Sequence, residues 1–485
     1  MSIRPWVVVE APDSRGLRRV TIGSETVGSA WSLDELRELL SRLGYPEDLD
    51  MEDPASICWR GGDSRTWPDR AGRRRATLVL MVAGLLAAMA LNAVIGWPDA
   101  LGALTFAQRM TGALFVLSGA VLGVAAIAAL DYWGRRQYKV SGAVVLLGVL
   151  VSLATDSLLV FMWLEEREYT PYLWVFMPLW CWSVWALVLL VRGKSWKGVP
   201  QPKRFAAGVV VTALLTAVSL AYSTMYQPAA APVHFILKAE FGTSRADKWL
   251  PLVHVPLKLY LKNDGGIPVY IINDDYTVYG RTADYSEGPI VRGWRKSIDK
   301  HGDEEADAEL YVDHLEYTII SSGHVYGPGR WLEVGEEFTL QHVFQLPQNA
   351  KDFDTVSAVF QISYMRKDRG KLAVDEFEVA HHSWNRREGR YYCPPALKGC
   401  DERVIYHGRV RHNNNLVNVT RKPRYVTAIW SLFDRPVFSI SSSFDFRRAK
   451  ADVSEEKREL DRYGASTVHV DSEVSVAELM KSAGV

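Results

Sequence analysis

The chain of 485 residues has no excess of charge of either sign, because 56 lysines and arginines balance 56 aspartates and glutamates. Without a net basic charge the sequence predicts no nucleic-acid partner. Charge is also scarce in one long stretch. Residues 76–226 hold 16 charged side chains, whereas the rest of the chain holds the other 96. This contrast excludes a soluble enzyme that runs the full length of the chain.

Five apolar runs lie in the charge-poor stretch, and each has the roughly 20 residues that a helix needs to cross about 30 Å of hydrocarbon. We expect transmembrane helices at about 76–97, 110–130, 140–164, 172–191 and 205–226. The alternative is a soluble domain with five helices that are apolar on every face. The polar segment before the first run lacks the features of a cleavable signal peptide, so the first helix is expected to direct insertion.

Lysine and arginine near the spans predict the orientation of the chain. Three residues flank one side: Arg109, Arg167 and Lys238. Twelve flank the other: Arg70, Arg73, Arg74, Arg75, Arg135, Arg136, Lys139, Arg192, Lys194, Lys197, Lys203 and Arg204. We therefore expect a multi-pass protein of the plasma membrane with a cytoplasmic N-terminus. An odd number of spans places the C-terminus outside the cytoplasm.

Cysteine is rare, with four residues in the chain. Cys393 and Cys400 are the two that follow Cys181, and they flank a turn that contains Pro394-Pro395. In an oxidising compartment such a pair can close a small loop, which agrees with an external location. The alternative, two unpaired thiols, stays open because the pairing is inferred from spacing.

The first 70 residues predict a small α+β module in the cytoplasm. Alternating residues within 5–27 surround a turn, as in a β-hairpin. Ser32 and Glu35 form a capping box at the start of an amphipathic helix, and residues 57–63 can add an edge strand and a turn. A phosphate loop at Gly61-Gly62 is the less favoured interpretation, because no Lys-Ser/Thr pair follows.

These residues carry a resemblance to a protein family. Ser32-Leu33-Asp34, Asp53-Pro54 and Trp59-Arg60-Gly61-Gly62 follow one another as in uncharacterised actinobacterial multi-pass membrane proteins with a small N-terminal module. The resemblance covers roughly the first 65 residues. It implies a bacterial source and no activity or functional residue.

Small residues recur along the predicted spans at intervals that let helix backbones approach closely. The helix-packing positions are Gly119 and Gly123 in the second span, and Ala213, Ala217 and Ala221 in the fifth. They predict a compact bundle. We favour packing within one chain over packing between two copies, and the oligomeric state is not predicted.

Asp156 is the one strongly unusual residue within the spans. A carboxylate inside a bilayer needs a partner, a wet cavity or a proton. One hypothesis is a proton or cation relay. The favoured one is a structural aspartate that bonds between helices, because no intramembrane Lys, Arg, His or Glu accompanies it. Trp180 and Trp182 also lie near mid-depth, and Asp156 or Ser183 can accept their indole hydrogens.

Period-two patterns dominate residues 228–450 and predict an all-β, immunoglobulin-like antiparallel sandwich. The expected strands are 233–241, 253–263, 267–281, 309–320, 336–346, 355–366, 371–380 and 403–411. The last 35 residues, 451–485, are interpreted as a partly helical, loosely attached tail. No metal or cofactor is predicted: His381 and His382 point to opposite faces of a strand, and the acidic run 301–307 lacks the EF-hand order of ligands.

The favoured function is that of a non-enzymatic integral membrane protein whose external domain binds a protein partner or a ligand. A sensor, a subunit of an envelope complex and a membrane effector all fit this two-sided arrangement. A transporter or channel component that uses Asp156 is the alternative. An envelope enzyme with its site on the external domain is the third class.

Overall fold

The computed structural model describes residues 7–12, 16–46, 49–65, 67, 71–103, 106–134, 138, 140–193, 232–285, 287–288, 312–350, 353–432, 436–444 and 453–484. The predicted fifth span and the acidic run 301–307 lie outside these residues, as do Ala213, Ala217 and Ala221. The chain divides into two compact units. We call residues 1–222 with 415–421 the helical unit, and residues 223–414 with 422–485 the β-rich unit.

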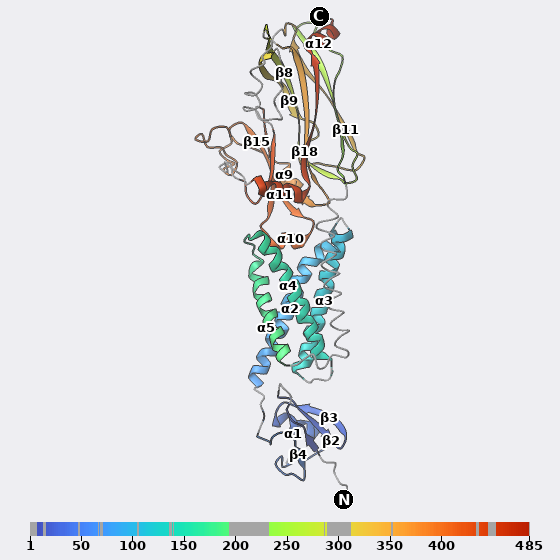
Figure 1. Cartoon of the computed structure of the whole chain (residues 1–485), viewed down its shortest axis with the longest axis vertical. Coiled ribbons are helices and arrows are strands. Elements are labelled where there is room, and N and C mark those ends of the chain that lie inside the picture. Colours follow the sequence, from blue (N-terminus) through green and yellow to red (C-terminus); the bar gives the residue numbers. More distant parts are fainter. Residues whose placement is uncertain are drawn as a thin grey trace. The chain divides into compact units, whose positions relative to one another are not determined.

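The helical unit begins with a module of four strands and one helix, where the sequence predicts a hairpin, an edge strand and one helix (Figure 1). Its sheet has the order β3-β2-β1-β4, formed by β1 (Val7–Val9), β2 (Arg18–Ile22), β3 (Glu25–Ala30) and β4 (Ile57–Trp59). Helix α1 (Leu33–Arg42) begins where the Ser32 hydroxyl accepts the Glu35 amide at 3.3 Å. The Glu35 carboxylate in turn accepts the Trp31 amide at 2.9 Å, so the reciprocal bond reaches one residue further back than in the standard capping box.

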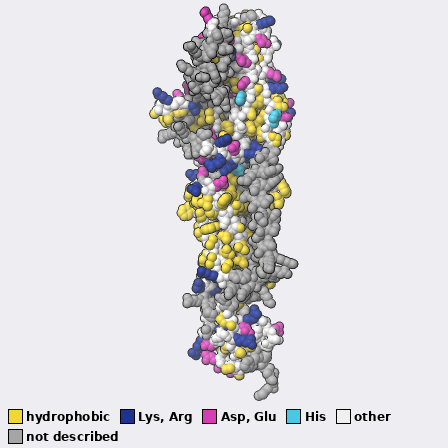
Figure 2. Space-filling view, in the orientation of Figure 1, with side chains coloured by type: hydrophobic (Ala, Val, Ile, Leu, Met, Phe, Trp, Pro, Cys, Tyr) yellow, Lys and Arg dark blue, Asp and Glu magenta, His cyan; other side chains and the backbone are white. Residues whose placement is uncertain are grey.

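Four long apolar helices follow: α2 (Ala71–Gly102), α3 (Phe106–Trp133), α4 (Ser141–Glu166) and α5 (Leu173–Arg192). Each is long and apolar enough to cross a membrane. Hydrophobic side chains cover much of their visible surface (Figure 2), as expected of helices that face lipid rather than water. These helices fit a membrane protein, and they coincide with the first four predicted spans.

In the residues that the structure describes, the β-rich unit contains three sheets, and every strand pairing in them is antiparallel. The first has the order β10-β8-β12-β18 with β9 also on β8, and the second has the order β11-β7-β5 with β6 also on β7. Their strands are β5 (Phe235–Phe241), β6 (Arg245–Ala246), β7 (Leu252–Asn263), β8 (Val269–Tyr285), β9 (Val312–His324), β10 (Trp331–Leu332), β11 (Glu337–Pro347), β12 (Thr355–Arg366) and β18 (Ala465–Ser475).

The two sheets share one hydrophobic core. Alternate residues of β7, from Val253 to Leu261, are fully buried, and they pack with Val356, Phe360 and other inward-facing residues of β8 and β12. The third sheet has the order β13-β15-β16-β17 with β14 on β15, and it buries its own core against Tyr270 and Ile272 of β8. Its strands are β13 (Gly370–Leu372), β14 (Ala380–His382), β15 (Arg403–His412), β16 (Arg424–Ser431) and β17 (Val437–Ser441).

The structure differs from the prediction in two segments. The expected strand 371–380 is divided, because helix α9 (Val374–Phe377) separates β13 from β14 and buries Phe377 in the third-sheet core. The tail is not loosely attached. Helix α11 (Val453–Tyr463) leads into β18, which pairs with β12 along its length, and α12 (Val476–Ala483) adds Val476 and Leu479 to the main core.

Candidate functional site

The short helix α10 (Asn415–Thr420) belongs to the helical unit although it lies between β15 and β16 in the sequence. Helix α10 lies at one end of the long helices (Figure 1). Leu416 is 1% exposed and Val419 is 3% exposed. Both pack in a cluster with side chains of α2, α3, α4 and α5, which are Leu91, Ile95, Phe115, Leu159, Phe176 and Leu179. The chain therefore leaves the β-rich unit, enters the bundle as α10, and returns.

Polar contacts hold both ends of α10. The Asp99 carboxylate accepts the Asn415 amide at 2.8 Å, and the Asn415 side chain donates to the carbonyl oxygens of Val94 and Ile95, each at 3.2 Å. At the other end the Thr170 hydroxyl donates to the Val419 carbonyl at 3.0 Å. Asp99 is 6% exposed and Thr170 is 1% exposed, so these bonds satisfy groups that are costly to bury alone. The contact is therefore specific in geometry as well as apolar.

Asp156 joins α4 to α5. Its Oδ2 accepts the Ser183 hydroxyl at 2.9 Å and the Ser152 hydroxyl at 3.1 Å, and the two serine oxygens lie 3.0 Å apart. All three side chains are fully buried, and Asp156 Oδ1 has no hydrogen-bond partner in the described part of the chain. This arrangement can fix the packing of two helices, and its free oxygen can also carry a proton.

The mid-depth tryptophans use other acceptors than the two predicted. Trp180 donates to the Ser157 hydroxyl at 3.0 Å, and Trp182 donates to the Leu80 carbonyl at 3.1 Å. Trp182 reaches α2 because Gly84 has no side chain: a Cβ there would lie 2.0 Å from the indole. Sequence spacing could not reveal these partners, since they depend on how the helices are rotated.

The small residues of α3 face α2 of the same chain. A Cβ on Gly119 would lie 3.4 Å from the Met89 carbonyl oxygen, and one on Gly123 would lie 3.1 Å from the Met89 sulfur. About two turns from Gly119 on α3, Gly112 meets Gly96 of α2 so closely that a Cβ on either glycine would overlap the opposite backbone. Glycine residues on both α2 and α3 therefore allow the two helix backbones to approach closely.

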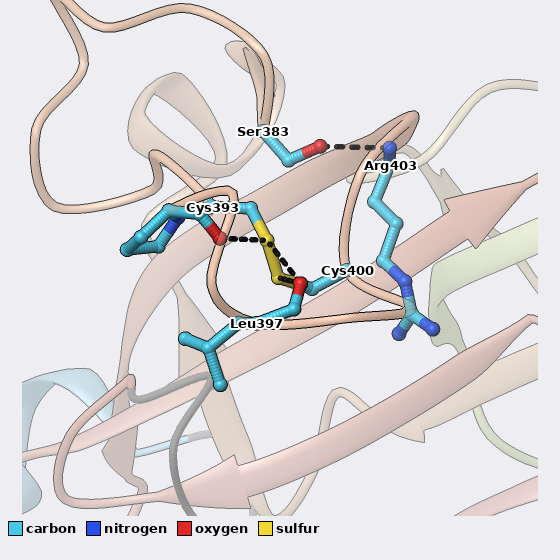
Figure 3. Close-up of a disulfide and its surroundings, with 6 residues drawn as sticks. Ser383, Cys393, Leu397, Cys400 and Arg403 are labelled. Atoms are coloured by element: carbon cyan, nitrogen blue, oxygen red, sulfur yellow. Dashed lines mark hydrogen bonds between the residues drawn. A yellow bond between two sulfur atoms is a disulfide. The ribbon is translucent and has the colours of Figure 1, made fainter.

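In the β-rich unit a disulfide joins Cys393 to Cys400, whose Cα atoms lie 5.8 Å apart. It closes part of the loop that runs from β14 to β15 (Figure 3). The Ser383 hydroxyl accepts the Arg403 amide at 2.9 Å and the Ser383 carbonyl accepts the Cys393 amide at 2.8 Å. We call residues 383–403 the disulfide loop. The bond and the Ser383 contacts hold both ends of the loop together.

His407 lies on the face of β15 that is opposite to the third-sheet core. It is 6% exposed, its Nδ1 lies 2.9 Å from the Thr427 hydroxyl, and its Nε2 has no hydrogen-bond partner among the described residues. The ring stacks on Tyr425, with the centroids 4.9 Å apart, and Tyr391 of the disulfide loop approaches to 5.7 Å. Burial lowers the pKa of His407 to about 4, aided by the charge of Arg390, so the ring is neutral near pH 7.

A second buried cluster lies where β8 meets β9. Asp274 Oδ2 accepts the backbone amides of Val325 at 3.0 Å, of Tyr326, and of Gly327 at 2.8 Å. His324 Nδ1 lies 3.5 Å from Asp274 Oδ1, and His324 is paired in register with Asp275. Such a cluster of adjacent carboxyl groups can respond to pH.

The pKa values of this cluster are shifted in the same direction. Burial raises the pKa of Asp275 to about 7, and the negative charge of Asp274 adds to the effect. For His324, burial acts to lower the pKa, but the hydrogen bond to Asp274 and its charge outweigh it, so the pKa is raised. Both groups therefore hold protons at higher pH than they would in water.

The histidines form no metal site in the part of the chain that the structure describes, where no group of three or more potential ligands converges. His381 and His382 lie on β14, as the sequence indicates. His381 stacks on Tyr391 with the centroids 4.0 Å apart, and His382 lies against Trp384 at 4.8 Å. The sequence carries no local signal for His407, Asp99 or Asn415, because their contacts join segments that are distant in the chain.

No model of a known protein family matches the chain, and neither does any curated protein. Among solved structures, a protein from Bordetella pertussis described as ApaA is 11% identical with a TM-score of 0.14; the match covers 28% of this chain and 82% of that one. Spo0M, a sporulation control protein from Bacillus subtilis, is 16% identical with a TM-score of 0.16. This match covers 52% of this chain and 93% of Spo0M. At these scores neither similarity bears on function.

Proposed function

We propose that this chain is a non-enzymatic membrane sensor or complex subunit: its β-rich unit binds a ligand or partner outside the cytoplasm, and α10 passes the bound state to the transmembrane bundle. The supporting observation is the burial of Leu416 and Val419 among helix side chains. A domain tethered only at its N-terminal end would need no such second crossing of the chain.

The same proposal includes the membrane topology and the type of each domain. It comprises five spans in the plasma membrane, a cytoplasmic N-terminal module of the actinobacterial type described above, and an immunoglobulin-like sandwich formed by the first two sheets. The Lys/Arg distribution supports the orientation, and the core shared by β7, β8, β11 and β12 supports the sandwich.

Coupling through α10 has a physical basis in its two kinds of contact. Strands β15 and β16 flank it directly, so a shift of these strands must displace α10 or strain the short connections. The bonds of Asn415 to Asp99, Val94 and Ile95 break if α10 moves by more than about 1 Å, because hydrogen bonds weaken steeply with distance. A change in the third sheet therefore alters the free energy of the bundle.

Hydrogen exchange of the full-length protein in lipid nanodiscs tests this coupling without a ligand. We expect the double variant Leu416→Ala, Val419→Ala to speed amide exchange in the last turns of α2 and in β15 and β16. Val417→Ala is the matched control, because Val417 is on the same helix but outside the buried cluster. Faster exchange confined to α10 itself would show that the helix passes nothing to either unit.

A transporter or channel component that uses Asp156 is the second candidate. The observation in its favour is the buried Oδ1 of Asp156, which has no partner among the described residues. Against it, both partners of Oδ2 are serine hydroxyls, Ser152 on α4 itself and Ser183 on the neighbouring helix α5, an arrangement that fits helix packing. Proton flux into proteoliposomes, lost in Asp156→Asn, would favour this candidate over the sensor.

A further inference from the structure

The third sheet packs against the first along strand β8, and the contact has two parts. In the apolar part, Tyr270 and Ile272 of β8 share the third-sheet core with Val426 and Ala428 of β16. Burial of apolar surface does not depend on the protonation of any side chain. This part therefore holds the two sheets together over the whole physiological range of pH.

The second part of the contact is polar. The ring centroid of His324, at the end of β9, lies 5.9 Å from that of Tyr406 on β15 and 5.2 Å from that of Trp430 on β16. Asp275 of β8 is directly opposite His324 in the register, and opposed residues project from the same face of a sheet. Asp275 is 5% exposed. We call Asp275, His324, Tyr406 and Trp430 the sheet joint.

Other titratable side chains next to Asp275 and His324 are Asp274, Tyr326 and Tyr406. One oxygen of Asp274 accepts three backbone amides, and the negative charge of Asp274 acts on both members of the pair. The two phenols keep their protons near neutral pH, because burial raises the pKa of each. The two tyrosines therefore contribute no change of charge in this range.

Across the first sheet, Asp275 lies in one row with Gln361 of β12 and His469 of β18. Gln361 does not titrate, and its strand separates Asp275 from His469. His469 is exposed, so water and salt screen its charge. The proton balance of the sheet joint is therefore set by Asp275 and His324 beside the charge of Asp274.

The closed joint holds protons that the separated side chains would release. The pKa of Asp275 is about 7, because burial and the charge of Asp274 disfavour its carboxylate. The pKa of His324 is also raised: burial acts to lower it, and the hydrogen bond to Asp274 and its charge outweigh that effect. When both protons leave, two adjacent carboxylates remain without a cation. For each proton that only the closed joint holds, closure weakens about tenfold for each rise of one pH unit.

We propose that the sheet joint is a proton-operated switch: it closes at mildly acidic pH and holds β15 and β16 against β8 and β9, and it opens at alkaline pH while the apolar part keeps the sheets together. The His324 side chain is 26% exposed, so protons of the medium reach it. Strands β15 and β16 flank α10, so the state of the joint acts on the segment that enters the bundle. This inference rests on the proposed function, because it names the proton as the ligand that the β-rich unit senses.

Hydrogen exchange of the full-length protein in nanodiscs of zwitterionic lipid, at pH 5.5 and pH 8.0, tests the switch. Labelling times are scaled to correct for the pH dependence of intrinsic amide exchange. We expect corrected exchange in β15 and β16 to be about tenfold or more faster at pH 8.0. Strand β7, whose alternate residues lie in the main core, is the internal reference and should change less.

Three variants assign the effect to the joint. Asp275→Asn is neutral at every pH and should keep β15 and β16 protected at pH 8.0 as well as at pH 5.5. His324→Gln cannot take up the second proton, so the pH difference should shrink at least threefold. His469→Gln is the matched control, an exposed histidine in the same row of the sheet, and it should retain the full difference.

Four results would overturn the proposal. They are equal corrected exchange of β15 and β16 at the two pH values, an equally large change in β7, an undiminished pH difference in Asp275→Asn, and an equal loss of that difference in His469→Gln. His407, on the opposite face of β15, cannot produce the expected result, because its lowered pKa destabilises the fold at acidic pH. The exchange experiment on α10 needs no change of pH, so failure of the switch and failure of the coupling are separate outcomes.

Discussion

At the scale of single residues, Asp156 is defined by its two serine partners. Asp156→Asn should leave the bundle nearly as stable as before, because an amide oxygen can still accept the Ser152 and Ser183 hydroxyls. Asp156→Leu should lose about 1–2 kcal/mol, since both bonds disappear. Thermal unfolding in nanodiscs measures both variants. If the Asn variant unfolds as early as the Leu variant, hydrogen bonding is not what Asp156 contributes.

The cluster at Asp275 makes the stability of the β-rich unit depend on pH. An aspartate whose folded-state pKa is raised stabilises the fold below its unfolded pKa of about 4, and this contribution is lost as the pH rises to about 7. The loss is on the order of 4 kcal/mol at 1.4 kcal/mol for each pKa unit. The raised pKa of His324 acts in the same sense, with its loss at the higher pH values.

Asp275→Asn should therefore flatten this dependence. The amide is neutral at every pH and can keep a contact with Asn273, whose side chain donates to Asp275 at 3.0 Å. We expect the melting temperature of the variant to exceed that of the parent by a margin that grows from pH 5 to pH 8. His407→Gln is the matched comparison, because His407 titrates in the opposite sense. The lowered pKa of His407 destabilises the folded state of the parent as the pH falls below about 6.5. A constant difference across this pH range would rule out Asp275 as the titrating group.

At the scale of elements, local signals predicted most of the structure. The hairpin β1–β2, the helix that begins after Ser32, and seven of the eight expected strands each follow from a periodic pattern with a turn or cap at its end. The expected strand 371–380, which the structure divides, has a physical reason to differ. Residues 374–377 form a helix because Phe377 enters the third-sheet core, a tertiary demand that overrides the local pattern.

Strand β18 shows the same limit. Its alternating Val468, Val470 and Val474 give a period-two signal, but two adjacent helical patterns led to the interpretation of a tail. Only the fold reveals that β12 has an edge that β18 covers over 11 residues. The positions of Asp99, Asn415 and His407 were equally hidden, because each acts through segments far away in the sequence.

Truncation after Gly464 tests the importance of β18. The shortened chain loses the pairing with β12 and the buried side chains of Val476 and Leu479, so we expect the β-rich unit not to fold. Removal of Gly484 and Val485 alone is the control and should leave its folding intact. Limited proteolysis of membranes that contain each form measures the result. A protease-resistant fragment from the long truncation would restore the interpretation of a loose tail.

At the scale of the whole molecule, we expect the N-terminal module and the β-rich unit to lie in different compartments. Their cysteines should therefore meet different redox conditions. Four apolar helices suggest insertion into a membrane, and the Lys/Arg distribution predicts that residues after 226 lie outside the cytoplasm. Reporter fusions check this orientation directly. A reporter that works only in the cytoplasm should be active at residue 1 and silent at the C-terminus, and activity at the C-terminus would reverse the assignment.

The disulfide gives an independent test of the same orientation in the native chain. If the β-rich unit folds outside the cytoplasm, Cys393 and Cys400 should be oxidised, whereas Cys58 in the N-terminal module should remain a thiol. A loop of this length gains only about 2–3 kcal/mol from the bond, so we expect local stiffening of the disulfide loop rather than dependence of the whole unit on it. Differential alkylation of intact cells, followed by peptide mass spectrometry, measures all three cysteines at once. Free thiols at both Cys393 and Cys400 would leave the orientation supported by charge alone.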